Sequence, residues 1–214
     1  MQFETSDGVT IHASYYDPNK SNATPVILLH MLSRNRNDWN DFAKLLQSNG
    51  YAVLSIDLRG HGQSTSKSGK TINWQQFTDR DFNDMKLDIE AAKNFLLHQP
   101  TVNKNKLVII GASIGANLAL SYSINDKDIK GITLLSPGVN YRGVTTTDKI
   151  KRYNNSVLLV ASEDDSQSVD ATKLLYAMAT GDKQLKIYQN AGHGTRMFSG
   201  TDLDKIILNW LKKI

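Results

Sequence analysis

The chain has 214 residues, of which 40% are hydrophobic and 21% are charged, as in an ordinary soluble globular protein. Its net charge of +4 comes with scattered lysines rather than a basic stripe interleaved with aromatic residues, so nucleic-acid binding is not expected. It has no cysteine, which excludes disulfides, thiolate metal sites and a cysteine nucleophile and fits a reducing, cytoplasmic location.

Targeting and membrane segments are also not expected. Residues 1–18 lack a basic stretch followed by an apolar core, so they do not resemble a signal peptide. No apolar run approaches the length of a membrane span. The sequence contains no internal repeat, low-complexity tract or linker, and we therefore expect residues 1–214 to form one domain.

The first half of the chain begins with two short strands around the turn signal Asp7-Gly8. An apolar strand is expected over residues 25–30, and a helix with apolar residues at helical spacing follows it and stops at Gly50. A buried-type strand then runs from Tyr51 into a glycine-containing turn. A polar loop over residues 64–70 leads to a long helix that ends before a proline.

The second half alternates strands with helices. Strands are expected over residues 106–111, 131–138, 156–165 and 184–194. Helices are expected over residues 116–123, 171–178 and 203–214. The strand cores are nearly continuous runs of Val, Ile and Leu, which indicate an α/β fold whose mostly parallel sheet has helices on both faces. Active sites in such sheets lie at the carboxyl ends of the strands.

A possible nucleophile stands at one of these strand ends. Ser113 lies in Gly-Ala-Ser-Ile-Gly, between an expected strand and an expected helix, and fits the pattern G-x-S-x-G. The flanking Gly111 and Gly115 would let strand and helix approach closely, and the hydroxyl would point out above the sheet. A helix-capping turn serine is the structural alternative.

A serine nucleophile needs a base, and the base needs a group that holds it. Among the five histidines, His193 is the best candidate because it follows the last expected strand and is flanked by glycines. His12 and His98 are expected to be structural. His30 and His61 end strands.

The acid should follow the strand that begins at Ser156, where Glu163, Asp164 and Asp165 stand together. We choose Asp165, because the turn needs a few residues before a carboxylate can face back toward His193. Asp164 is the alternative.

With these residues in place, the sequence resembles the α/β-hydrolase fold family over nearly its whole length. The matching segments are the loop from Leu28 to Trp39, the turn "IDLRGHGQS", the elbow "GASIGA" and the loop "NAGHG". The order Ser113, Asp165, His193 is the order of the family's triad. The resemblance implies an eight-stranded, mostly parallel sheet and serine hydrolase chemistry with no metal or organic cofactor.

The same resemblance implies that the backbone amides of Leu32 and Ile114 form an oxyanion hole. It also exposes one departure, because Met31 stands where the family usually has glycine. By the same resemblance, His30 is expected to brace the loop that contains Met31, and His61, with Asp57 and Arg59, is expected to be scaffold for a turn near the site.

Residues 140–156 are too few to form a cap domain, so we expect an open site whose apolar walls include Met31 and Trp74. The expected activity is hydrolysis of carboxylic esters with short acyl chains through an acyl-enzyme. A thioesterase, a small-peptide hydrolase and a ligand-binding protein that retains the triad remain alternatives. The expected partner is a small acyl substrate, with no nucleic acid or membrane, and the sequence does not set the oligomeric state.

Overall fold

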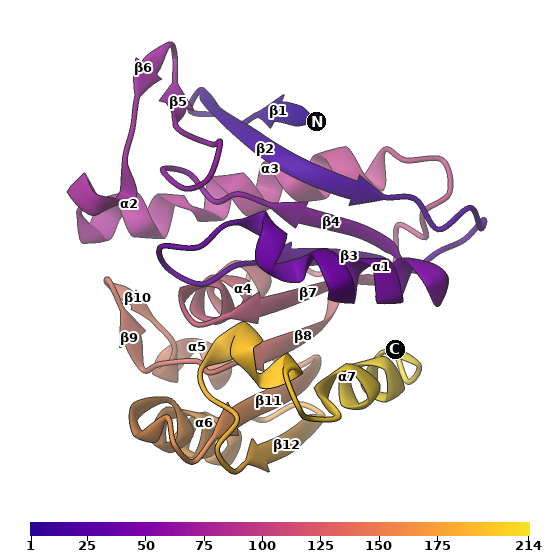
Figure 1. The fold of residues 1–214 in the computed structure, drawn as a ribbon, viewed down its shortest axis with the longest axis vertical. Coiled ribbons are helices and arrows are strands. Elements are labelled where there is room, and N and C mark those ends of the chain that lie inside the picture. Colours follow the sequence, from indigo (N-terminus) through magenta and orange to yellow (C-terminus); the bar gives the residue numbers. More distant parts are fainter.

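The computed structural model describes residues 1–214 and contains a mostly parallel sheet of ten strands (Figure 1). The parallel strands are β3 (Pro25–Leu29), β4 (Ala52–Ile56), β7 (Leu107–Ala112), β8 (Ile129–Leu135), β11 (Ser156–Ser162) and β12 (Lys183–Tyr188). The antiparallel strands are β1 (Gln2–Glu4), β2 (Val9–Tyr16), β5 (Ser66–Lys67) and β6 (Lys70–Thr71). Their order is β12-β11-β8-β7-β3-β4-β2-β5-β6, with β1 paired to β2, so β12, β6 and β1 each have one neighbour and are edge strands.

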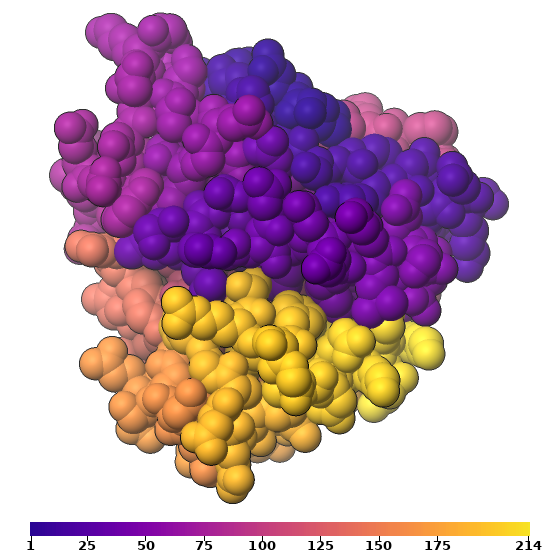
Figure 2. All heavy atoms as spheres, in the orientation of Figure 1, coloured from indigo at the N-terminus to yellow at the C-terminus, as the bar shows by residue number.

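The expected fold class is confirmed, but the sheet has more than the eight strands that were expected. The two additional strands, β5 and β6, form a hairpin in the segment expected to be a polar loop. Ser68 and Gly69 at its tip have φ angles of +48° and +77°, as a tight hairpin turn requires. Strands of two polar residues carry no hydrophobic pattern, and the sequence therefore did not reveal them. The hairpin projects from the body of the molecule at the upper left of Figure 2.

Helices cover both faces of the sheet. They are α1 (Asn40–Ser48), α2 (Asp79–Asp84), α3 (Lys86–Leu97), α4 (Ile114–Ser123), α5 (Thr147–Ile150), α6 (Ser166–Met178) and α7 (Leu203–Leu211), with short 3-10 helices η1 (Arg36–Trp39), η2 (Trp74–Gln76) and η3 (Gly194–Phe198). Along β3, Val26 and Leu28 pack in the core with α1 and α7, whereas Ile27 and Leu29 pack in the core with α3 and α4. Burial on both faces explains the continuous apolar runs. No helix combines the length and the apolarity needed to cross a bilayer.

The long helix expected before Pro100 is divided at Met85 into α2 and α3. The amide of Met85 donates to the carbonyl oxygen of Phe82, three residues earlier, over 3.3 Å. A bond of this kind belongs to a 3-10 turn, which locally tightens the helix. The apolar spacing does not distinguish the two geometries over a single turn.

Strand β7 and helix α4 cross at very short range. A Cβ atom on Gly111 would lie 2.1 Å from the carbonyl oxygen of Gly115. A Cβ atom on Gly115 would lie 2.5 Å from the carbonyl oxygen of Leu29 in the neighbouring strand. Both distances are impossible for a side chain, so only glycine allows β7, α4 and β3 to approach in this way.

Two buried imidazoles brace the loops that follow β3 and β4. His30 donates from Nδ1 to the carbonyl oxygen of Met31 over 2.7 Å, and its Nε2 accepts from the amide of Leu58 over 3.0 Å. The ring of His61 lies 5.0 Å from that of His30 and bonds through Nδ1 to the carbonyl oxygen of Arg59 over 3.0 Å. Burial lowers the pKa of His30, and it lowers the pKa of His61 to about 3.

Ion pairs hold the turn after β4. Arg59 Nε lies 2.8 Å from Asp88 Oδ1, and the end of the same guanidinium lies 2.9 Å from Asp7. Asp57 pairs with Arg36 of η1. Burial raises the pKa of Asp88 to about 6, although Arg59 opposes that rise. Asp57 and Arg59 therefore make scaffold contacts, as the sequence indicated.

Substitution of Gly111 by alanine should lower the free energy of unfolding by about 3 kcal/mol, because the new methyl group overlaps backbone atoms that cannot move away. Gly200→Ala is the control: Gly200 has a φ of +74° but no atom within 4 Å of its Cβ position. Its cost should be about 1 kcal/mol, from backbone strain alone. Urea unfolding of both variants measures the difference. Equal losses would show that the close crossing is not the constraint.

The contribution of buried His61 to stability should rise with pH between about pH 3 and pH 6.5, because the unfolded chain protonates a histidine that stays neutral in the folded protein. The raised pKa of Asp88 opposes this rise between about pH 4 and pH 6 and is the same in the variant below. A group with the lowered pKa of His61 contributes about 2 kcal/mol to this rise between about pH 5 and pH 7. His61→Phe removes one such group and keeps a ring against Trp74, so the rise should shrink by that amount. Urea unfolding at both pH values checks this, and an unchanged rise would contradict it.

Candidate active site

Ser113 occupies a sharp turn between β7 and α4. Its φ and ψ are +55° and −121°, a conformation that is uncommon for any residue except glycine. Its amide donates to the carbonyl oxygen of Leu135 at the end of β8 over 2.8 Å, which anchors the turn to the sheet. The residue is 7% exposed and directly precedes the first turn of α4, where the helix dipole favours negative charge.

His193 and Asp165 are paired. The distance between His193 Nδ1 and Asp165 Oδ2 is 2.5 Å, and both side chains are partly exposed. Asp165 directly precedes α6, and its amide donates to the carbonyl oxygen of Ser162 at the end of β11 over 3.0 Å. His193 follows β12 and directly precedes η3. The pair therefore comes from two neighbouring strand ends.

The loop that carries His193 is held by acceptors at strand ends. The amide of Gly194 donates to Ser136 Oγ over 2.9 Å, and the amide of Ala191 donates to Ser162 Oγ over 2.8 Å. Ser136 and Ser162 were not identified from the sequence. The sequence carries only a weak indication of their role, namely that each is a serine at the end of an apolar strand.

Asp164 also binds this loop rather than the imidazole. Its carboxylate accepts from the amide of Gly192 over 3.1 Å and from the hydroxyl of Ser162. These bonds, chiefly the one from Ser162, lower the pKa of Asp164. The two neighbouring aspartates thus make different contacts: Asp165 with the ring of His193, and Asp164 with the backbone that supports it.

Ser113 lies at the same edge of the sheet, without a hydrogen bond to His193. Contact between the two segments is close, because a Cβ atom on Gly194 would lie 3.4 Å from Cβ of Ala112, the neighbour of Ser113. The structure therefore joins Asp165 to His193 directly. Ser113 lies beside them because it follows β7, which is separated from β11 by β8 alone.

Two backbone amides are available on the other side of Ser113. The amide of Leu32, after β3, makes no hydrogen bond within the protein. Ile114 is the first residue of α4, and the amides of a first helical turn have no acceptor within their helix. The contact of Gly115 with the carbonyl oxygens of Leu29 and His30 brings the loop after β3 beside the start of α4.

Met31 and Trp74 have different surroundings. Met31 is 8% exposed, and its sulfur lies 2.4 Å from the position that a Cβ atom on Gly194 would take. This packing supports the loop that carries His193 and leaves little of Met31 to line a substrate pocket. Trp74 is half-buried and stacks on His61, with ring centroids 5.3 Å apart.

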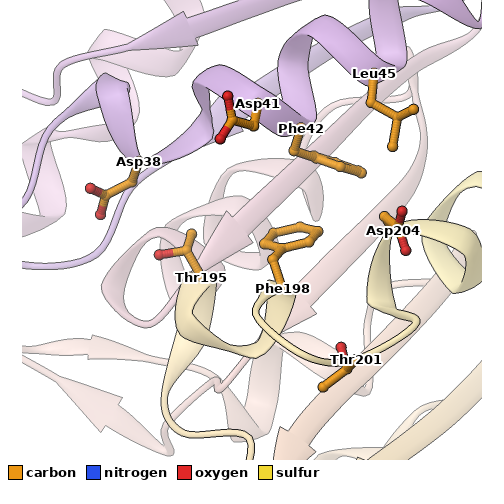
Figure 3. Close-up of a pocket in the computed structure, with 8 residues that line it drawn as sticks. All are labelled: Asp38, Asp41, Phe42, Leu45, Thr195, Phe198, Thr201 and Asp204. Atoms are coloured by element: carbon orange, nitrogen blue, oxygen red, sulfur yellow. The ribbon is translucent and has the colours of Figure 1, made fainter.

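Figure 3 shows a pocket of about 280 Å³ on the outer flank of this region, between α1 and the segment from η3 to α7. Phe42 and Phe198 face each other across it with centroids 4.6 Å apart. Ser113, Asp165 and His193 do not line it. Nowhere in the structure do three or more His, Asp or Glu side chains gather closely enough to hold a metal ion.

The sequence is also similar to characterised proteins. A family model described as "Serine aminopeptidase, S33" matches residues 20–156, which include Ser113 but not Asp165 or His193. An sn-1-specific diacylglycerol lipase, ABHD11 of Danio rerio, is 28% identical over 126 residues, 58% of this chain and 34% of that protein. The match thus spans about a third of that curated relative's length.

Solved structures share the fold over almost the whole chain. DcsB, solved with its substrate analogue, superposes with a TM-score of 0.85 at 14% identity, covering 100% of this chain and 98% of DcsB. An esterase from Exiguobacterium antarcticum gives 0.78 at 15% identity, covering 99% of each chain. Esterase Pf2001 of Pyrococcus furiosus gives 0.78 at 17% identity, covering 100% of this chain and 91% of the esterase.

At these identities the structural similarity establishes the fold alone, and the family model supplies the relationship. It matches more than half of the chain and includes the strand-turn-helix unit with Ser113. The chain therefore has the α/β-hydrolase fold and belongs to the family described as serine aminopeptidase, S33.

Proposed function

We propose that the protein is a serine hydrolase that cleaves carboxylic esters of short acyl chains through an acyl-enzyme. The observation that carries the proposal is the His193–Asp165 pair, which is held beside a serine at the start of a helix. A serine in this setting needs a base that is itself oriented by a third group, and the pair supplies both.

In the proposed reaction, Nε2 of His193 takes the proton of Ser113 Oγ as this oxygen attacks the ester carbonyl carbon. Asp165 accepts the hydrogen bond from Nδ1, which fixes the tautomer and stabilises the imidazolium. The protonated His193 then gives its proton to the alcohol oxygen as the alcohol leaves. Water, deprotonated by the same imidazole, attacks the acyl-enzyme and releases the acid.

The amides of Leu32 and Ile114 are the proposed donors to the oxyanion. Leu32 follows β3, the neighbour of β7 on the side away from β11 and β12, and Ile114 is the residue directly after Ser113. Each such donor can lower the barrier by about 3 kcal/mol, since the negative charge exists only along the reaction path.

The short-acyl preference rests on the segment between β8 and β11. It contains only β9 (Asn140–Tyr141), β10 (Val144–Thr145) and α5, whereas an independent cap domain needs upward of about 50 residues. The proposed site is therefore open, with Trp74 on one wall. Each methylene of a long acyl chain that stays in water forgoes about 0.8 kcal/mol.

Amide substrates are the second candidate, because the matching family model is described as a serine aminopeptidase. The same three side chains could open an amide bond. Parallel assays of an aminoacyl p-nitroanilide, an acyl thioester and p-nitrophenyl acetate distinguish these activities.

Substitution of Ser113 by alanine should reduce hydrolysis of p-nitrophenyl acetate by about 10⁴-fold or more, because the attacking oxygen is removed. The variant should also lose labelling by a fluorophosphonate probe, and its thermal unfolding should match that of the wild type. Retention of most of the activity would exclude Ser113 as the nucleophile.

The two adjacent aspartates provide a matched control for the base. Asp165→Asn should lower kcat by about 10⁴-fold, because the imidazole loses the carboxylate that orients it. Asp164→Asn should cost no more than about tenfold, the worth of one hydrogen bond to the supporting loop. The opposite ranking would assign the acid to Asp164.

Activity on p-nitrophenyl esters should be highest for acetate to butyrate and should fall as the acyl chain lengthens to palmitate. The expected reason is the open site, which cannot bury a long chain. The measured quantity is kcat/KM for each ester below its aggregation limit. A steady increase of kcat/KM up to palmitate would contradict the short-acyl proposal while leaving the hydrolase proposal intact.

A further inference from the structure

The hairpin of β9 and β10 is fixed to the helix that begins at the candidate nucleophile. Asn117, one turn after Ser113 on α4, is fully buried. Its Nδ2 donates to the carbonyl oxygen of Val144 over 2.7 Å, and its Oδ1 accepts from the amide of Gly138 over 3.0 Å. A single carboxamide thus binds both ends of the segment 138–144.

The tip of the hairpin is fixed as well. Arg142 and Gly143 have φ angles of +52° and +77° and form a two-residue turn. The side-chain amide of Asn83 donates to the carbonyl oxygen of Gly143 over 3.1 Å. A Cβ atom on Gly143 would lie 2.6 Å from Asp79 of α2, so the tip packs directly on that helix. The hairpin is therefore a rigid part of the site wall.

Tyr141 is the residue that this hairpin presents to the site. Its ring lies against Gly138, where a Cβ atom would be 2.6 Å from the ring carbon that bears the hydroxyl. The hydroxyl lies 3.1 Å from Ser168 Oγ in the first turn of α6, and Ser168 Oγ lies 3.4 Å from His193 Nδ1. This arrangement connects Tyr141 to the imidazole through one intervening hydroxyl.

The Tyr141 hydroxyl is also close to the other two members of the proposed triad. Burial raises its pKa, the charge of Asp165 raises it further, and the hydroxyls of Ser168 and Ser113 lower it. It does not form a hydrogen bond of ordinary length with Ser113. Tyr141 thus carries a neutral O–H group that lies near the proposed triad and whose hydrogen-bond partner in the structure is the hydroxyl of Ser168.

The sheet order shows which part of a bound ester this donor would face. Ser113 follows β7, and the two neighbours of β7 are β3 and β8. Leu32 follows β3, whereas Tyr141 follows β8, on the side from which Asp165 and His193 also come. The oxyanion belongs to the side of Leu32. The oxygen of the departing alcohol, which receives its proton from His193, belongs to the side of Tyr141.

We infer that Tyr141 is a further catalytic residue, whose hydroxyl donates a hydrogen bond to the leaving-group oxygen of the ester. The inference rests on the proposed function. As the tetrahedral intermediate collapses, the bond between carbon and the alcohol oxygen breaks, and its electron pair stays on that oxygen. The proton comes from His193 Nε2. Tyr141 keeps its own proton and stabilises the negative charge that develops before this transfer is complete.

The experiment compares two acetate esters that differ in their leaving group. With p-nitrophenyl acetate the departing oxygen is already stable as an anion, and with ethyl acetate it is not. Tyr141→Phe removes only the hydroxyl, so kcat/KM for ethyl acetate should fall about 10- to 100-fold. The value for p-nitrophenyl acetate should change less than about threefold. A hydroxyl that only supported the fold would affect both esters equally.

Tyr153→Phe is the matched control, since Tyr153 lies in the same connection between β8 and β11 and its buried hydroxyl has no hydrogen-bond partner. Tyr153→Phe should leave kcat/KM unchanged for both ethyl acetate and p-nitrophenyl acetate. Equal losses on the two esters with Tyr141→Phe, or no loss on either, would overturn the role of Tyr141 and leave the hydrolase proposal standing. If the protein hydrolysed neither ester, or if Ser113→Ala did not reduce the hydrolysis, both the role of Tyr141 and the hydrolase proposal would be overturned.

Discussion

The contact of bare backbone at Gly111 and Gly115 is the constraint on which the rest of the candidate site depends. Where β7, α4 and β3 meet, no side chain fits between them. Helix α4 must therefore begin immediately after β7 ends, and Ser113 takes a positive φ to make the turn. The strain is offset by the hydrogen bond from the Ser113 amide to the carbonyl oxygen of Leu135 and by the burial of α4, which follows. The hydroxyl is consequently placed by backbone packing.

The imidazole is placed by a different kind of constraint. Gly192 and Gly194 have positive φ angles, which give the loop a shape that side chains rarely allow. Three of its amides then bond to acceptors at the ends of β8 and β11, namely Ser136, Ser162 and Asp164. A loop fixed by several hydrogen bonds loses little further freedom when a substrate arrives, so the ring and its carboxylate partner are already oriented.

The parts of the fold that follow from local pattern could be predicted from the sequence. The buried parallel strands carry continuous apolar runs, and the turn around Ser113 carries its glycines in sequence. The choice of Asp165 over Asp164 depended on the number of residues in one turn. In the structure Asp165 contacts the ring of His193 and Asp164 contacts the backbone of the loop, and the catalytic role of Asp165 stays a prediction.

Other parts depend on contacts between distant segments and leave no local signal. Ser136 bonds to an amide 58 residues away, and Asn117 binds a carbonyl 27 residues away. Nothing in the neighbouring residues of either position indicates those partners. Met31 was expected to line the site. Its sulfur instead packs against the loop that carries His193, in space that is open because Gly194 has no side chain.

The edges of the sheet bear on how molecules of this chain meet one another. At one end the sheet finishes in β6, which has two residues and offers little backbone for pairing. At the other end β12 leaves a row of unpaired N–H and C=O groups, a template for strand addition. Lys183 and Lys186 lie in that strand, so a second copy docking there would bring like charges together. Self-association by strand pairing, the route to aggregation in many sheet proteins, is therefore opposed at β6 and β12, and the third edge strand, β1, has only three residues.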